Sequence, residues 1–427
     1  MTRILIRAAL LSSALAATAL ASTAGAAGTF VQPTTVLHTF TGPSQGQGAY
    51  FGWAVSELRD INGDNVDDVI IGEVAGGSHQ AGRVWVYSGA SGQLLYRLTG
   101  KANDLNGYAV ADAGDVNGDG VPDVISGAPG AGSAPGNAYV YSGATGRVLT
   151  RLTGVSPGDG FGSAVSSAGD VNCDGYGDLL VGAPGSGAPG SAPGRAYVIS
   201  GRTFRVIRTL TAGENGDSFG SATDRSDDLN GDGVPDLIVG ASDAGSAQSG
   251  AAYVYSGATG TRLFRIASPA QGQEFGRFFA AGVGDTNGDS VPDIFVGDYA
   301  SNANGAASGY AGVYSGVDGS LLHGWPGASG GEGIGPGREA GDVNGDGKID
   351  LIIGSYTSSD GAPQAGKAQV FSGATGLPLR TITSTTANEN LGFDAVGVGD
   401  VNHNGSLDYL VSAANLDTVY LIDGNTR

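Results

Sequence analysis

The chain has 427 residues, with 21 basic and 41 acidic side chains and a formal net charge of −20. This charge excludes nucleic acid and anionic membrane surfaces as partners, because both attract Lys and Arg rather than carboxylates. Apolar residues make up 40% of the chain, enough for a packed core, and charged residues only 15%, so the acid is concentrated in particular segments.

The N-terminus has the pattern of a secretory signal peptide. Arg3 and Arg7 give a positive start, residues 10–20 are apolar, and residues 24–26 (AGA) form a small-residue cleavage pattern. We expect cleavage after about Ala26, with the Ala21–Ser22 bond as a second candidate. A buried or membrane helix is the competing interpretation, which the length and flanks of the segment disfavour.

Three segments follow from this pattern. We expect a signal peptide at residues 1–26, a short linker at 27–34 and one repeat domain at 35–427. No later stretch approaches the ~20 apolar residues that a membrane span needs. The sequence therefore predicts a soluble monomer that is secreted or periplasmic.

Cys173 is the only cysteine, so no intrachain disulfide can hold the loops, and they must be held by another kind of interaction.

An acidic motif recurs seven times along the repeat domain. Its copies start at residues 60, 115, 170, 228, 285, 342 and 400, so they lie 55–58 residues apart. A period of this size is typical of propellers, solenoids and linear arrays.

Each repeat contains four short segments with strand character. An AVSSAG-type segment precedes the acidic motif; a DLLVGA-type run, an AYVYSG-type run and an LLYRLTG-type run follow it, separated by Gly, Ser, Pro and Asn. Four-stranded units repeated seven times predict an all-β fold, a seven-bladed β-propeller of antiparallel blades. A linear array of small modules is less favourable, because one such sheet could hardly bury a core alone.

The two ends of the domain support a closed ring. Residues 35–42 resemble the fourth strand of a repeat but precede the first repeat, whereas the chain stops a few residues after the third strand of the last repeat, Thr418–Ile422. We expect the N-terminal strand to complete the last blade, which leaves no unpaired edge.

The acidic motifs have oxygen-bearing side chains at positions 1, 3, 5 and 9 without exception, 20 Asp and 8 Asn. This spacing in a tight turn suits Ca²⁺, which takes six to eight oxygen ligands and often a backbone carbonyl at position 7. Turn-forming Asp and Asn alone would not need fixed spacing at four positions. Up to seven Ca²⁺ ions are therefore predicted, and they would bring the net charge to about −6. The candidate ligands are Asp60, Asn62, Asp64, Asp68, Asp115, Asn117, Asp119, Asp123, Asp170, Asn172, Asp174, Asp178, Asp228, Asn230, Asp232, Asp236, Asp285, Asn287, Asp289, Asp293, Asp342, Asn344, Asp346, Asp350, Asp400, Asn402, Asn404 and Asp408.

Position 6 of each loop must turn sharply, and it is Gly in five loops, Asn65 in the first and Ser290 in the fifth. An EF-hand is excluded, because position 12 is never Glu and a strand follows instead of a helix. The seventh loop has Asn404 at position 5, hence one carboxylate fewer, and we expect it to be the weakest site.

The order Phe-Gly, acidic loop, Gly-Ala-Pro resembles the FG-GAP repeat of integrin α-subunit propellers. Phe161-Gly162 and Gly182-Ala183-Pro184 carry it in the third repeat. The resemblance implies calcium on one rim and ligands on the opposite face. The pattern erodes elsewhere: Asn106 replaces the Phe in the second repeat, and the sixth reads IGPG at 334–337. Integrin leg, membrane and cytoplasmic segments are absent, so signalling and β-subunit pairing do not carry over.

The predicted function is a calcium-stabilised, non-enzymatic recognition or adhesion module for an extracellular protein or glycan. The alternatives are a carbohydrate-active enzyme, either a polysaccharide lyase or a glycoside hydrolase, and a structural envelope protein. No catalytic residue is assigned, because the four His residues form no zinc-type pair and no Gly-x-Ser-x-Gly motif occurs. No ligand-binding residue is assigned either. The repeat aromatics, such as Phe219 and Tyr253, are expected between blades. Trp53, Trp85 and Trp325 break the pattern and are the better surface candidates, although a structural role is favoured for each of them.

Overall fold

The computed structural model describes residues 30–43, 48–130, 134–185, 193–212, 216–245, 247–269 and 272–425. The predicted signal peptide lies outside these residues, as does the start of the predicted linker. All 28 candidate calcium ligands lie within them.

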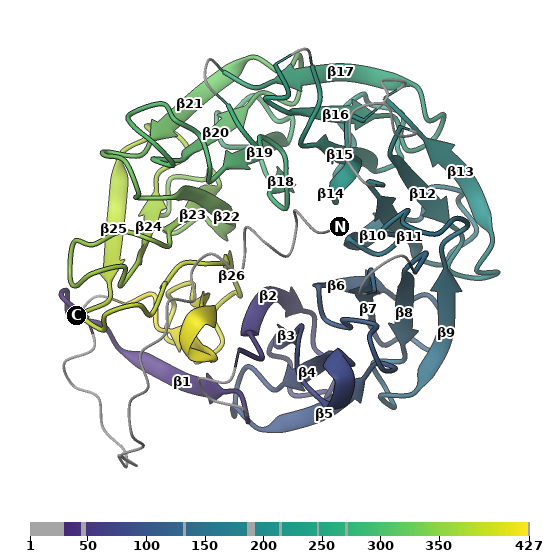
Figure 1. Ribbon diagram of the computed structural model, residues 1–427, viewed down its shortest axis with the longest axis horizontal. Helices are drawn as coiled ribbons and strands as arrows, with labels where there is room; N and C mark the ends of the chain where they lie inside the picture. The colour runs from purple at the N-terminus through teal and green to yellow at the C-terminus, as the bar shows by residue number, and fades with distance from the viewer. Residues whose placement is uncertain are drawn as a thin grey trace.

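Seven four-stranded antiparallel sheets surround a central axis and form a closed β-propeller (Figure 1). Blades one to six each use four consecutive strands, which we call A to D from the centre outwards. The strands are β2 (Phe51–Leu58), β3 (Asp68–Glu73), β4 (Arg83–Tyr87) and β5 (Leu94–Thr99) in blade one; β6 (Ala109–Gly114), β7 (Asp123–Ala128), β8 (Asn137–Tyr141) and β9 (Val148–Thr153) in blade two; β10 (Ala164–Gly169), β11 (Asp178–Ala183), β12 (Arg195–Ile199) and β13 (Val206–Leu210) in blade three; β14 (Phe219–Ser226), β15 (Asp236–Ala241), β16 (Ala251–Tyr255) and β17 (Arg262–Ala267) in blade four; β18 (Ala280–Val283), β19 (Asp293–Asp298), β20 (Tyr310–Tyr314) and β21 (Leu321–Pro326) in blade five; and β22 (Ile334–Gly341), β23 (Asp350–Ser355), β24 (Lys367–Phe371) and β25 (Pro378–Thr383) in blade six.

Blade seven joins the two ends of the chain. It contains β26 (Ala395–Gly397), β27 (Tyr409–Ala413) and β28 (Thr418–Ile422), and its outer strand is the N-terminal β1 (Val36–Thr41). Strand β1 is antiparallel to β28, with Thr39 opposite Tyr420. The predicted closure of the ring is therefore confirmed. Within the described ranges, two short 3₁₀ helices, at Ser78–Gln80 and Ala414–Leu416, lie in loops.

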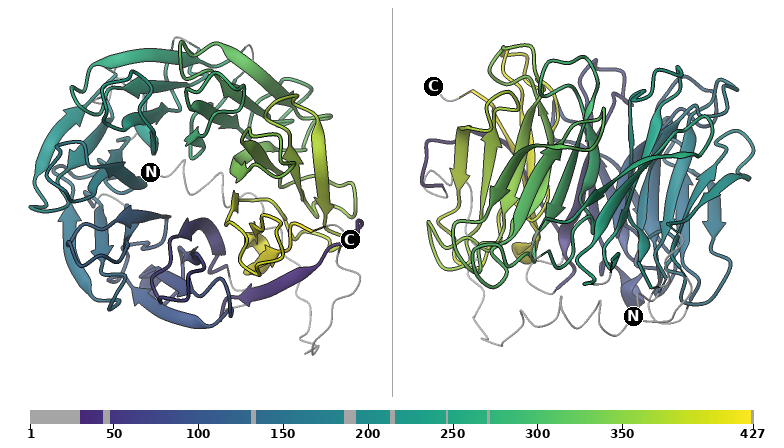
Figure 2. Two further views of the ribbon diagram at one scale, coloured as in Figure 1. Left: turned by 180° about the vertical axis from the view of Figure 1, so that it is seen from behind. Right: turned by 90° about the horizontal axis from the view of Figure 1, so that it is seen from above.

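The core lies between neighbouring blades rather than inside any one of them. Strand B is buried along its whole length in each blade, whereas strand D alternates between covered and exposed residues. One apolar cluster joins Ile70 and Val84 of blade one to Val124 and Tyr139 of blade two. A cluster of the same kind joins blade seven to blade one, so the closing junction packs like the others. Figure 2 shows the resulting ring from behind and from the side.

The Phe-Gly and Gly-Ala-Pro segments bring neighbouring blades into backbone contact. Gly162, with φ +86°, donates a hydrogen bond of 2.9 Å from its N–H to the carbonyl of Gly182 in its own blade. A Cβ on Gly127 of the preceding blade would stand 2.0 Å from the Gly162 carbonyl oxygen. Such an approach is open only to glycine. The same contact recurs between Gly72 and Gly107, Gly182 and Gly220, Gly240 and Gly276, Gly297 and Gly335, and Gly354 and Gly392.

In blades that lack the Phe of the motif, another buried residue occupies the same position. Phe161 makes an isolated parallel bridge to Gly136 of the preceding blade. Asn106, Ile334 and Leu391 make the equivalent bridge where the motif has eroded, and all three are buried. The Phe of the motif is thus one of several side chains that fill the junction, while the following glycine is required by the backbone.

Candidate functional site

Each acidic loop connects strand A to strand B of its blade, so all seven lie on one face of the ring. Positions 1 to 8 form the turn, and the position-9 aspartate stands at the start of strand B, as Asp123 does in β7 and Asp178 in β11. The structure therefore brings the four predicted positions of every loop into one turn, as expected from their spacing.

The position-1 aspartate organises the turn. Asp115 accepts a hydrogen bond of 2.6 Å from the Gly118 N–H through Oδ1 and one of 2.8 Å from the Gly120 N–H through Oδ2. The backbone has positive φ at position 6 in every loop, as predicted, and also at position 4. The position-4 residues are Gly63, Gly118, Cys173, Gly231, Gly288, Gly345 and His403.

Positive φ at position 4 was not predicted. Glycine at this position in five of the seven copies was the available signal. Cys173 and His403 hold the same left-handed conformation with φ of 56° and 58°, which is strained for residues with a Cβ. Cys173 is exposed and unpaired.

The position-9 aspartate ties the loop to the rest of the blade. Asp123 is 0% exposed and accepts hydrogen bonds of 3.0 Å from the N–H groups of Val116, at position 2, and Gly143, which follows strand C. The same two bonds recur in all seven blades. Position 9 thus has a structural role in addition to the predicted metal-binding role.

The electrostatics of the loops favour a cation. Burial, together with the carboxylates at positions 5 and 1, raises the pKa of Asp68 to about 7 and that of Asp123 and Asp178 to about 6. Burial alone would also raise the pKa of Asp60, but four backbone N–H groups hold it below its usual value. The backbone thus favours the charged form of Asp60, and a positive ion beside the buried position-9 carboxylates would favour theirs.

The donor chemistry of the loops fits calcium. Every side chain at the four positions offers oxygen, the ligand that this hard cation prefers. Among the described residues, no group of three or more His, Cys, Asp or Glu is arranged so as to hold a metal ion by itself. A calcium ion would therefore need the position-3 asparagine and backbone carbonyls as well as the carboxylates.

A cavity of about 950 Å³ lies on the axis of the ring, lined mainly by the A strands and by residues just before and after strands A and B. Its mouth, on the face opposite the acidic loops, carries aromatic side chains from several blades. The ring centroids of Trp53 and Phe393 are 5.2 Å apart, and those of Trp53 and Tyr108 are 5.7 Å apart. Phe278 and Tyr356 extend this cluster, which we call the aromatic mouth together with Tyr299.

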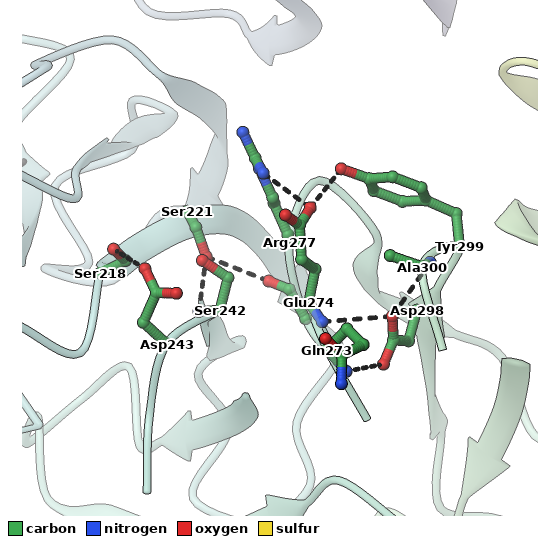
Figure 3. Close-up of polar contacts among 11 residues, drawn as sticks. Ser218, Ser221, Ser242, Asp243, Gln273, Glu274, Arg277, Asp298, Tyr299 and Ala300 are labelled. Atoms are coloured by element: carbon green, nitrogen blue, oxygen red, sulfur yellow. Dashed lines mark hydrogen bonds and ion pairs between the residues drawn. The ribbon is translucent and has the colours of Figure 1, made fainter. Parts of the chain in front are cut away.

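A buried ion pair stands beside the aromatic mouth (Figure 3). Arg277 Nη1 lies 2.6 Å from Glu274 Oε2, which also accepts a hydrogen bond from the Tyr299 hydroxyl. Asp298 holds the Glu274 segment through the Gln273 and Glu274 N–H groups, at 2.9 and 3.2 Å. The guanidinium of Arg277 lies 4.9 Å from the ring centroid of Phe278, a cation–π geometry.

Deeper in the cavity the lining becomes charged. Arg338 pairs with Asp394 at 2.9 Å and Arg59 pairs with Asp112 at 2.8 Å. Glu57 lies among them and lines the cavity, with an exposed side chain. Burial, followed by the nearby carboxylates of Glu339, Asp67 and Asp112, raises the pKa of Glu57 to about 7.

The aromatic mouth was not assigned from the sequence. Trp53, Tyr108 and Phe393 each follow the glycine of the Phe-Gly position, and this shared place was the signal that could have identified them. Of the three tryptophans suggested for the surface, only Trp53 reaches the cavity. Trp85 and Trp325 are buried, with their indole N–H groups bonded to Glu73 and to the Gly376 carbonyl, so these two have the structural role that was favoured for each tryptophan and not the alternative place on the surface. Phe219 and Tyr253 are buried, as predicted.

The fold and the loops define a class: a seven-bladed propeller built from Phe-Gly/Gly-Ala-Pro repeats with an acidic turn in each blade. Comparison with known protein families supports the repeat class over part of the chain. The family described as FG-GAP repeat matches residues 106–146 and 161–199, and the family described as FG-GAP-like repeat matches residues 228–296.

These residues therefore carry FG-GAP-type repeats, and the chain is similar to integrin α subunits. Integrin alpha-5 of Xenopus laevis is 32% identical over 213 residues, 45% of this chain and 20% of the relative. Integrin alpha-V of Gallus gallus is 32% identical over 220 residues, again 45% and 20%. Phosphatidylinositol-glycan-specific phospholipase D of Bos taurus is 37% identical over 174 residues, 36% and 20%. The matched part is about a fifth of each relative.

In the part of the chain that the structure describes, no helix has the length and apolar character needed to cross a bilayer.

Proposed function

We propose that this chain is an exported, calcium-binding propeller that recognises an extracellular protein or glycan without chemical turnover. The observation that carries the recognition part is the cavity of about 950 Å³ with its aromatic mouth, on the face opposite the acidic loops. Concave sites lined by aromatic rings with a few polar groups are the usual form of a binding site. The similarity to integrin α chains supports the same role.

The calcium part rests on the loop chemistry. The residues at positions 1, 3, 5 and 9 of each loop would hold the ion, for example Asp115, Asn117, Asp119 and Asp123. When bound, calcium would neutralise the carboxylates of its loop. The chain's own contribution is the preformed turn, in which position 1 is already oriented by backbone N–H groups and position 9 by the blade.

Export rests on the sequence alone. The signal peptide proposed for residues 1–26 would place the protein in a compartment where free calcium is high enough for loops of this kind, which in extracellular modules bind at about 10⁻⁴–10⁻³ M. Mass spectrometry of the N-terminus of the exported protein would identify the processed residue, and an unprocessed Met1 would contradict this part of the proposal.

Binding can be tested on a glycan array and on a panel of purified secreted glycoproteins, with turnover assays on every ligand that binds. The variant Trp53→Ala/Phe393→Ala removes two rings of the aromatic mouth and should abolish binding. Tyr176→Ala removes an aromatic ring from an acidic loop on the other face and is the matched control, which should bind normally. Equal binding by both variants would place the ligand outside the cavity, and cleavage of a bound ligand would contradict the non-enzymatic role.

A further inference from the structure

The seventh acidic loop differs from the other six at position 5, where Asn404 replaces aspartate. Counted within the loop, this leaves two carboxylates, Asp400 and Asp408, where the others have three. The sequence alone therefore predicts the weakest calcium site here. The structure adds a neighbour that lies outside the loop.

That neighbour is Asp423, the first residue after β28. In every blade the residue after strand C is followed by a glycine whose N–H donates to the position-9 aspartate; in blade seven this is Gly424 to Asp408, at 2.8 Å. Asp423 therefore occupies the place that serine fills in the other six blades. The six serines are Ser88, Ser142, Ser200, Ser256, Ser315 and Ser372.

The residue at this place contacts position 5 of its own loop. In blade one the Ser88 hydroxyl lies 3.3 Å from Asp64 Oδ2, and in blade four the Ser256 hydroxyl lies 3.1 Å from Asp232 Oδ2. In blade seven Asn404 Nδ2 donates to Asp423 Oδ1 at 2.9 Å. In blade seven the carboxylate therefore belongs to the residue after strand C and the neutral hydrogen-bonding group to position 5, the reverse of blades one and four.

We propose that Asp423 supplies the third carboxylate of the seventh loop and makes that loop a calcium site comparable to the other six. This inference rests on the proposed calcium function. A carboxylate across the contact restores the charge of the donor set, and charge count is a main determinant of calcium affinity in such loops. The site would then draw ligands from the A–B loop and from the end of strand C.

Asp423 is held in place independently of the loop. Its N–H donates to the Thr35 carbonyl at 3.0 Å, next to the closing strand β1, and its carbonyl accepts a hydrogen bond of 2.6 Å from Arg380 Nη1 of blade six. Its Oδ1 also accepts the Asn425 N–H at 2.7 Å. The carboxylate therefore has a fixed position beside position 5 without needing a metal to order it.

The experiment measures calcium bound per full-length chain by equilibrium dialysis, at a free calcium concentration that saturates the wild type. Asp423→Ser should lose one calcium per chain. Asn404→Asp/Asp423→Ser recreates the arrangement of the other blades and should regain it. Ser256→Ala removes the neutral partner in blade four and is the matched control, which should keep the wild-type number.

A second pair of variants tests the same exchange in blade four, so that a folding defect caused by Asp423→Ser cannot explain the result. In blade four, Asp232→Asn should lose one calcium and Asp232→Asn/Ser256→Asp should regain it. A wild-type chain that binds no calcium would defeat the proposed function itself. A wild type that binds calcium while Asp423→Ser keeps every equivalent, or a blade-four exchange that regains none, would overturn the role of Asp423 and leave the calcium function standing.

Discussion

The carbonyl oxygen of Gly162 lies 2.0 Å from the point where a Cβ on Gly127 would stand. These two glycines belong to neighbouring blades, and the contact between them repeats around most of the ring. It explains why the two halves of the repeat motif occur together: the glycine of one blade's Gly-Ala-Pro segment receives the backbone of the next blade's Phe-Gly pair. The motif is thus a junction between blades, and it fixes the A strands that line the axial cavity.

Gly127→Ala should destabilise the ring, because the added methyl meets backbone that no rotamer change can move. We expect a loss of about 1–3 kcal/mol in the free energy of unfolding, the usual cost of overpacking, measured as a lower Tm. Gly158→Ala is the control: Gly158 has φ +81° and no atom near its Cβ position, so only backbone strain opposes the change. Equal losses in the two variants would refute the junction role of Gly127.

Removal of calcium should lower the stability of the whole ring. The carboxylates of each loop repel one another without a cation, and an ion that binds only the folded chain stabilises it by about 2.7 kcal/mol per site at a hundredfold excess over Kd. Calorimetry should therefore show a lower Tm in EGTA than in millimolar calcium, with recovery on adding calcium back. An identical Tm in both conditions would contradict calcium binding by the folded loops.

Much of the fold could be predicted because it follows from local sequence patterns. The strand expected at Thr418–Ile422 has those bounds in the structure, and the N-terminal strand pairs with it as the missing fourth strand implied. Left-handed turns at position 6 follow from glycine. Each of these features depends on a few neighbouring residues and on a repeat period, both of which are visible without knowledge of distant contacts.

The aromatic mouth and the partner of Asn404 depend on distant contacts and could not be predicted in the same way. Trp53 and Phe393 are far apart in the sequence and meet only because the ring closes. Asp423 reaches the seventh loop only through the register of strand C, which the loop sequence does not encode. The burial of the position-9 aspartates also follows from the sheet, since they begin a strand that is covered on both sides.

The cavity should give the protein a pH dependence through Glu57. Its pKa is about 7 in the folded chain against 4.5 ordinarily, so the folded state binds this proton more tightly than the unfolded state. Its contribution to stability is complete below pH 4.5 and is lost as the pH rises to about 7. The groups that face it are Glu339, Asp67 and Asp112, which raise its pKa, and Arg338, which lowers it.

Glu57→Gln should flatten the fall in Tm between pH 4.5 and 7, measured in saturating calcium so that the loop carboxylates are engaged. Asp318→Asn, at an exposed C–D turn, is the control and should keep the wild-type slope. A Glu57→Gln profile that runs parallel to the wild type would show that the carboxyl titrates normally.

Arg277→Gln should destabilise the protein more than loss of an exposed arginine. The side chains of Arg277 and Glu274 are 18% and 10% exposed, and removing the guanidinium takes its countercharge away from the nearly buried Glu274 carboxylate, at a cost of about 3 kcal/mol. Arg59→Gln is the matched comparison, because Arg59 is 61% exposed and such pairs contribute at most about 1 kcal/mol. Urea unfolding of both variants measures the loss in the free energy of unfolding, and a larger loss for Arg59→Gln would contradict the prediction.

Closure of the ring by β1 should be required for a stable monomer. Strand β1 covers the outer edge of β28, and Phe40 packs its ring 4.6 Å from that of Tyr87 in blade one. A chain that starts at residue 42 lacks the strand and leaves the N–H and carbonyl groups of β28 unpaired, an edge that recruits other chains. We expect a lower Tm and, by sedimentation, dimers or larger species.

A chain that starts at Phe30 keeps β1 and is the control for truncation itself, so it should behave as the full-length protein does. A synthetic peptide of residues 35–42 should restore the Tm of the shorter chain, because it can refill the edge of β28 with the native register in which Thr39 faces Tyr420. A shortened chain that stays monomeric with an unchanged Tm would mean that the packing between blades one and seven closes the ring without the strand.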